Sequence, residues 1–145
     1  MLEKLTWVVV ADESQAKVFS YLHLHKGLDF KTCLAFPEGQ DKIHEFTTER
    51  PTRKNYTQTH KHTSAGEVDV EHQLSQQFAK EVAEYLDQAR TAKKFEELVI
   101  IAPPKFLGDL RAKLSTGTAK VVKATINKEL THAPTEEVMK QVEAL

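Results

Sequence analysis

Hydrophobic positions along the chain fall into short apolar runs, period-two stretches and helical stripes. Thr6–Ala11 and Leu98–Ala102 are continuous apolar runs rich in β-branched residues, which is typical of strands covered on both faces. Gln15–His25 and Asp29–Phe36 instead alternate with period two, and only short turns separate them from each other and from the first run. These first three segments therefore predict an antiparallel meander.

Three apolar stripes with helical spacing follow, two in the middle of the chain and one near its end. Leu74, Phe78, Val82 and Leu86 recur every four residues and predict a helix that lies on a sheet, with either Ser64 or Asp69 as its N-cap. A second helix is expected after Pro103-Pro104, because proline ends a strand and suits the first turn of a helix. Its apolar stripe contains Phe106, Leu107, Leu110 and Leu114, and Gly117 would end it.

The end of the chain adds one strand and one helix. Ala119–Ile126 is expected to be a strand, and a last helix begins at about Pro134 with Val138, Met139, Val142 and Leu145 on one stripe. The order of elements predicts a single α/β domain over residues 1–145. We expect a three-layer-like architecture with three main helices and a mixed sheet, antiparallel in its first half and parallel, with β-α-β units, in its second.

A long polar loop is predicted over residues 37–72, with a short edge strand between residues 41 and 48. From Arg50 to His62 this loop contains no acidic residue. Basic residues interleaved with an aromatic ring suit a phosphate backbone and a stacked base, although a solvated surface loop can have the same composition. The candidate RNA-binding residues are Arg50, Arg53, Lys54, Tyr56 and Lys61.

Other chemistry has less support. His60, His62 and His72, with Asp69 nearby, are candidate metal ligands, but their spacing matches no established zinc motif, so no metal is predicted. The five glycines are scattered and form no phosphate loop, so no cofactor is predicted either. Asp12 is the best placed carboxylate, because it follows a strand at its carboxyl end.

Composition narrows the class of protein. The chain has 145 residues, a net charge of −1, 40% hydrophobic residues and one cysteine, Cys33, which we expect to be a small buried side chain. No apolar run approaches the roughly 20 residues of a membrane span, and no basic segment precedes an apolar one at the start. The sequence therefore predicts a cytoplasmic protein without membrane insertion, in which any nucleic-acid contact is local.

Six segments resemble, in matching order, the bacterial proteins required for attachment to host cells. They are WVVVADESQAKVF, FPEGQ, ERPTR, FAKEVAEYLDQA, FEELVIIAPPKFLGDLRAKLS and INKELTHAPTEEV. The resemblance covers nearly the whole chain, and APPKFLGDLR is its most specific part.

That family is in turn similar to the central domain of class-1 peptide-release factors, whose long loop carries a Gly-Gly-Gln tip. The corresponding loop here lacks Gly-Gly-Gln, since Gln58 is followed by Thr59-His60, so the resemblance transfers no catalytic residue. Together with the acid-free basic loop, this layout predicts a non-catalytic module that binds rRNA, tRNA or the ribosome. Two alternatives stay open: a hydrolase of an RNA-linked ester or phosphodiester that uses Gln58, His60 or His62, and a protein-interaction factor for attachment.

Overall fold

The computed structural model describes residues 4–22, 27–35 and 60–145, with the backbone alone over 60–69. Five strands form one sheet in the order β3-β2-β1-β4-β5. Their bounds are β1 (Thr6–Ala11), β2 (Gln15–Leu22), β3 (Gly27–Ala35), β4 (Glu97–Ala102) and β5 (Val122–Asn127). β1 pairs antiparallel with β2, and β2 with β3, whereas β1–β4 and β4–β5 are parallel. The predicted mixed sheet is confirmed.

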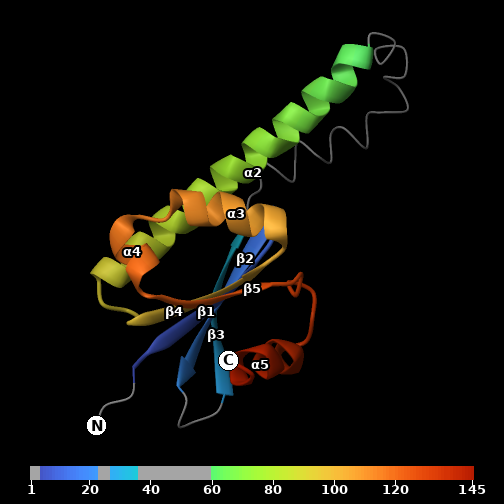
Figure 1. Ribbon diagram of the computed structural model, residues 1–145. Coiled ribbons are helices and arrows are strands. Elements are labelled where there is room, and N and C mark those ends of the chain that lie inside the picture. The colour runs from blue at the N-terminus through green and yellow to red at the C-terminus, as the bar shows by residue number, and fades with distance from the viewer. Residues whose placement is uncertain (1–3, 23–26, 36–59) are drawn as a thin grey trace.

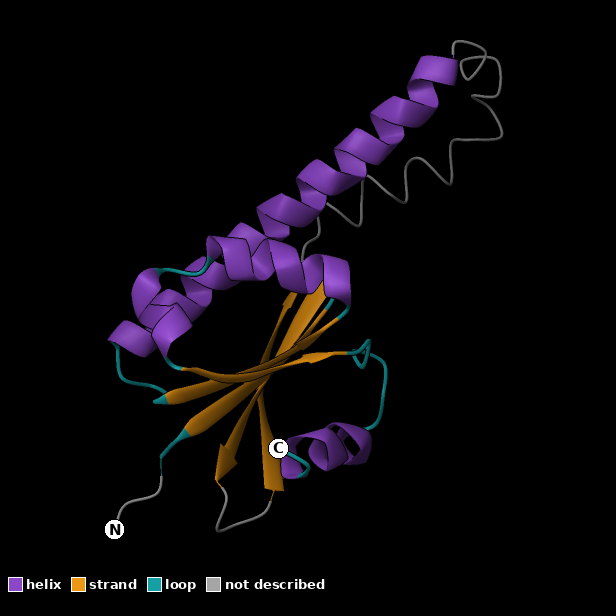
Figure 2. Cartoon of the chain, in the orientation of Figure 1, coloured by secondary structure: helices purple, strands orange, loops and turns teal. Residues whose placement is uncertain are grey.

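Helices cover both faces of this sheet. They are α2 (His60–Thr91), α3 (Pro104–Lys113), α4 (Thr116–Lys120) and α5 (Thr135–Glu143). α2, α3 and α4 lie on one face and α5 lies on the other, which gives three layers (Figure 1). The cartoon in Figure 2 shows the same layering, with the N-terminal half of α2 extending past the sheet.

The buried core consists of two clusters, one on each face of the sheet. Alternate residues of β1 supply both, because successive side chains of a strand point to opposite faces. Trp7 and Val9 pack under α2 and α3, whereas Val8 and Val10 pack under α5. The predicted stripes account for the helix contribution, which includes Phe78, Val82, Leu86, Phe106 and Leu110 in the first cluster and Val138 and Val142 in the second.

α2 begins earlier than the hydrophobic pattern indicates. The predicted loop ended at residue 72, but the helix already includes His60, so the prediction of a loop from 60 onward is wrong. The apolar stripe starts only at Leu74 because the preceding turns have no sheet beneath them to cover. Helix growth nonetheless adds one hydrogen bond per residue once the packed half has formed, and no proline interrupts it.

The segment after α3 also differs from the prediction. α3 ends at Lys113, and Gly117 lies inside the short helix α4 instead of ending α3. The Ser115 hydroxyl caps α4 by accepting a hydrogen bond from the backbone N–H of Thr118 at 3.2 Å. β5 consequently begins at Val122, three residues after the predicted start.

Both edge strands are irregular, and a lysine is the extra residue in each. Lys31 has no partner between the pairs Val18–Thr32 and Phe19–Phe30, and Lys123 has none between Leu98–Val122 and Val99–Ala124. Such β-bulges shift the following side chains to the opposite face. Phe30, just before the bulge, lies opposite Phe19 on the α5 face and is 59% exposed. Cys33, which was predicted to be buried, is exposed on this edge strand, so that prediction is wrong.

Candidate functional site

Only some of the candidate site residues that were predicted in the polar loop lie within the described ranges. Arg50, Arg53, Lys54, Tyr56 and Gln58 lie outside them, as does the proposed strand between residues 41 and 48. His60, Lys61 and His62 belong to the first turn of α2, and His72 lies further along it.

No group of three or more potential metal ligands occurs among the residues whose side chains the structure describes. The Nε2 atom of His72 lies 3.0 Å from Nε2 of Gln76 on the next turn. His72 therefore belongs to no such group, and the side chains of His60 and His62 lie outside those that the structure describes.

Asp12 occupies the predicted position at the carboxyl end of β1, but its oxygens are fully engaged. One oxygen accepts hydrogen bonds from the backbone N–H groups of Ser14 and Gln15 at 2.8 and 3.0 Å, and so orders the β1–β2 turn. The other accepts from the buried Thr131 hydroxyl at 2.7 Å. Asp12 is itself 7% exposed, so this carboxylate joins two segments of the chain and is not an open site.

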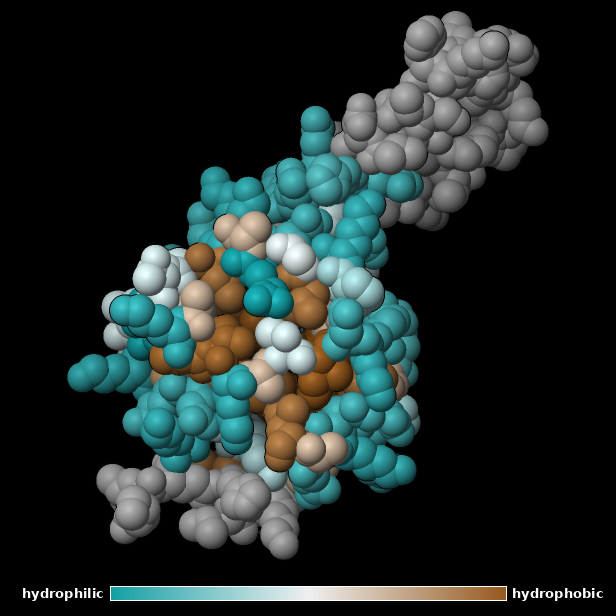
Figure 3. Space-filling view, viewed as in Figure 1, coloured by the Kyte–Doolittle hydropathy of each residue, from teal (hydrophilic) through white to brown (hydrophobic). Residues whose placement is uncertain are grey.

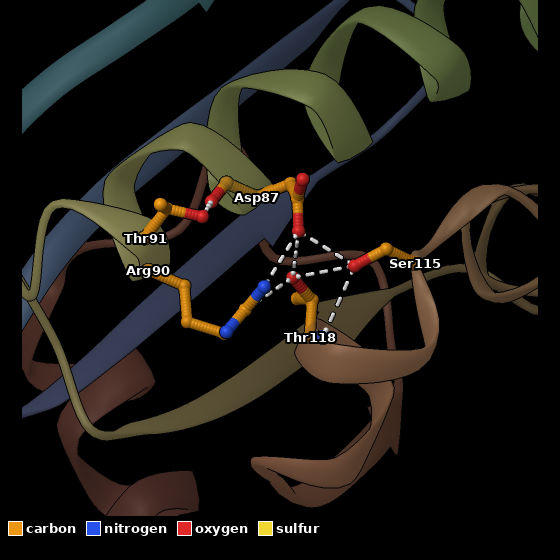
Figure 4. Close-up of polar contacts among 5 residues, drawn as sticks. All are labelled: Asp87, Arg90, Thr91, Ser115 and Thr118. Atoms are coloured by element: carbon orange, nitrogen blue, oxygen red, sulfur yellow. Dashed lines mark hydrogen bonds and ion pairs between the residues drawn. The ribbon is translucent and has the colours of Figure 1, made fainter.

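A second polar cluster joins α2 to α4 (Figure 4). Oδ1 of Asp87 accepts hydrogen bonds from Ser115 Oγ at 2.6 Å, Thr118 Oγ1 at 3.0 Å and Arg90 Nη2 at 3.1 Å. The hydrogen bond from Ser115, followed by those from Arg90 and Thr118, lowers the pKa of the Asp87 carboxyl below its usual value. This arrangement holds two helices together.

A hollow of about 400 Å³ opens where α3 and α4 meet the free edge of β5. Polar and apolar atoms contribute about equally to its exposed lining, and the polar side chains are the guanidinium group of Arg111 and the hydroxyl of Thr125. On the face that carries α3, α4 and β5, hydrophobic surface gathers in the centre and hydrophilic side chains surround it (Figure 3). The residues that line the hollow are Arg111, Leu114, Ala119, Val122, Ala124 and Thr125.

The segments that form or follow this hollow carry five exposed cations, which we call the basic edge. Arg111 lines the hollow, Lys113 and Lys120 are sequence neighbours of lining residues, and Lys123 separates two of them. Lys128 follows the end of β5. The segment from Arg111 to Lys128 contains no acidic residue. Within the described ranges, none of the five cations forms an ion pair or a side-chain hydrogen bond.

Reasoning from the sequence missed the basic edge, although its signal is present there. The absence of acids from Arg111 to Lys128 is as clear as in the loop from Arg50 to His62. The cations escape notice because they are spread over two helices, a strand and the connection that follows it. Only the packing of α3 and α4 beside β5 places Arg111 and the sequence neighbours of Lys113, Lys120 and Lys123 around one hollow.

Comparison with known proteins gives a family and one relative. The family model described as "Protein required for attachment to host cells" matches residues 7–142. An uncharacterized protein of Rickettsia prowazekii (strain Madrid E), RP470, is 41% identical over 71 residues. The match covers 48% of this chain and 44% of the Rickettsia protein, which is less than half of that relative.

Proposed function

We propose that this chain, which belongs to the family of proteins required for attachment to host cells, is a non-catalytic module that binds RNA through the basic edge. The observation that carries the proposal is the set of five exposed cations that have no acidic partner among the residues the structure describes. Cations that are not neutralised within the protein are free to replace the counterions of a phosphate backbone, which is the main source of affinity for nucleic acid.

The distribution of charge supports a local interface. The whole chain carries a net charge of −1, so a polyanion gains little from its average field. The basic edge instead gathers positive charge within one acid-free segment, from α3 to the residue that follows β5. Attraction to phosphate is therefore directed to that part of the molecule.

A second basic segment would extend the interface. Arg50, Arg53, Lys54 and Lys61 carry positive charge with no acid between Arg50 and His62, and the sequence places Tyr56 among them for stacking on a base. We also propose that the domain is related to the central domain of release factors, which would make ribosomal RNA the first RNA to test. We accordingly propose a cytoplasmic role at the ribosome.

The polar clusters favour binding over catalysis as the proposed role. Both carboxylate oxygens of Asp12 accept hydrogen bonds from the chain itself. Oδ1 of Asp87 likewise accepts three hydrogen bonds from neighbouring side chains. Each carboxylate has a structural role that its contacts explain.

The proposal is tested by measuring binding to ribosomal RNA as a function of salt. The variant Lys120→Glu/Lys123→Glu should weaken binding and reduce the slope of log K against log salt by about 2, if each lysine contacts one phosphate. The matched control is Lys80→Glu/Lys140→Glu, which makes the same charge change at two exposed lysines on α2 and α5. Equal affinities for the two variants would contradict the proposed use of the basic edge.

The contribution of the loop is tested separately with Arg53→Glu/Lys54→Glu. If the loop takes part, this variant should lose co-sedimentation with ribosomal particles on a sucrose gradient at low salt. Retained co-sedimentation would restrict the interface to the basic edge. Migration of the unaltered chain only at the top of the gradient would count against a ribosomal partner.

A further inference from the structure

We infer that the hollow beside β5 receives one unpaired nucleotide base, so that the chain selects single-stranded RNA over duplex RNA. This inference rests on the proposed RNA binding and deepens it by naming the form of RNA. The hollow of about 400 Å³ falls within the range of roughly 300–1,000 Å³ found for small-ligand pockets. Such a space can hold a planar group the size of a base.

The chemistry of the lining suits a base. Leu114 and Val122 offer apolar surface for its faces, and Thr125 offers a hydroxyl for its polar rim. The guanidinium group of Arg111 is planar and can stack on a base or donate hydrogen bonds to it. A base has apolar faces and a polar rim, so a lining that offers both kinds of surface is compatible with it.

A duplex cannot use this hollow. The bases of an A-form helix are stacked, and side chains cannot read its deep, narrow major groove. A duplex could therefore contact the lysines through its phosphates but would leave the hollow unfilled. In a single strand, the base can enter the hollow while the adjacent phosphates meet Lys113, Lys120 and Lys123, which lie next to lining residues in the sequence.

Two other occupants are less compatible with β5. An added peptide strand would need a regular edge, but Lys123 interrupts the strand as the extra residue of a bulge, and both features oppose pairing at edges. A second copy of this chain would bring two acid-free basic edges together, so like charges would repel. A nucleic acid meets neither obstacle.

The test compares the binding of a short fluorescent oligouridylate with that of the same strand annealed to oligoadenylate. The variant Ala119→Leu adds bulk to the lining without changing charge, and Ala112→Leu adds the same bulk to the exposed surface of α3 outside the hollow. We expect Ala119→Leu to weaken single-strand binding about tenfold and to leave duplex binding unchanged. Ala112→Leu should alter neither.

A second variant, Arg111→Lys, keeps the charge and removes the planar group, so it separates stacking from electrostatics. It should weaken single-strand binding while the salt slope stays constant. Equal affinity for both RNA forms, with Ala119→Leu without effect, would overturn the inference and leave RNA binding intact. Absence of binding to either RNA would overturn both proposals, and binding of polyglutamate instead would assign the surface to an acidic protein.

Discussion

Thr131 donates a hydrogen bond from its hydroxyl to Oδ2 of Asp12 at 2.7 Å, although 119 positions separate the two residues. The contact joins the β1–β2 turn to the connection between β5 and α5. Lys17 reinforces it, because its Nζ atom donates to the carbonyl oxygen of Thr131 at 2.6 Å. Two segments that are far apart in the sequence are thereby held together at the carboxyl end of β1.

Replacing Thr131 with valine should lower the free energy of unfolding by about 1–3 kcal/mol, because the hydroxyl that lies between Oδ2 of Asp12 and Oε1 of Glu129 is lost while the volume stays similar. Urea unfolding followed by the fluorescence of Trp7, which is 3% exposed, measures this change. Thr135→Val, at an exposed position on α5, is the control and should change stability by less than about 0.5 kcal/mol. Equal stability of the two variants would show that the bond contributes nothing.

Asp87 should make stability depend on pH in the acidic range. Its folded pKa is lowered below the ordinary value of 3.8, chiefly by the hydrogen bond from Ser115, so its contribution is complete above that value. The contribution is lost as pH falls through the folded pKa, because protonation then weakens the bonds that Oδ1 accepts. The stability difference between the native chain and Asp87→Asn should therefore shrink below pH 3.8. A difference that stays constant across this range would refute the role given to the carboxylate.

Two helical glycines should respond differently to alanine. A Cβ at Gly108 would meet no heavy atom within 4 Å, so Gly108→Ala should stabilise α3 by about 0.5–1 kcal/mol. A Cβ at Gly117 would lie 2.7 Å from Nη2 of Arg90, which would have to move away from Asp87 and Thr118. Thermal unfolding should rank Gly108→Ala above Gly117→Ala, and the reverse order would contradict the packing of α4 on α2.

Lys93 is the one non-glycine residue with a positive φ among those described, at 62°. It follows α2, where the backbone N–H of Lys93 binds the carbonyl of Arg90 and that of Lys94 binds the carbonyl of Ala89. A glycine is usual at this position, so Lys93→Gly should stabilise the chain by up to about 1 kcal/mol. Lys94→Gly relieves no positive φ and should not stabilise the chain. The denaturant concentrations at the midpoints of unfolding distinguish the two variants.

The sequence predicts the elements whose hydrophobic pattern follows directly from the layers that cover them. β1 and β4 are apolar on both faces because helices cover both, and the Pro103-Pro104 pair marks the junction between β4 and α3. α4 was not predicted, because its capping contact between Ser115 and Thr118 is local and polar and leaves no hydrophobic period. Cys33 was misplaced because pattern alone does not reveal that β3 is an edge strand with a bulge.

The candidate site was less accessible to prediction than the fold. A basic run within one segment, such as Arg50 to His62, is visible in the sequence. The hollow exists only because α3 and α4 leave part of β5 uncovered, which depends on where those helices end. Arg111 and Thr125 become neighbours of one cavity through that packing and not through any spacing between them.

The length of α2 has a consequence for hydrogen exchange. Phe78, Val82 and Leu86 are buried against the sheet, so the amide hydrogens of that half exchange with solvent only when the domain unfolds as a whole. The turns near His60 extend past the sheet and open by local fraying, so their amides exchange much sooner. One continuous helix thus contains two regions of different thermodynamic protection, and the boundary between them lies near Ser75, the first of its described side chains that is buried.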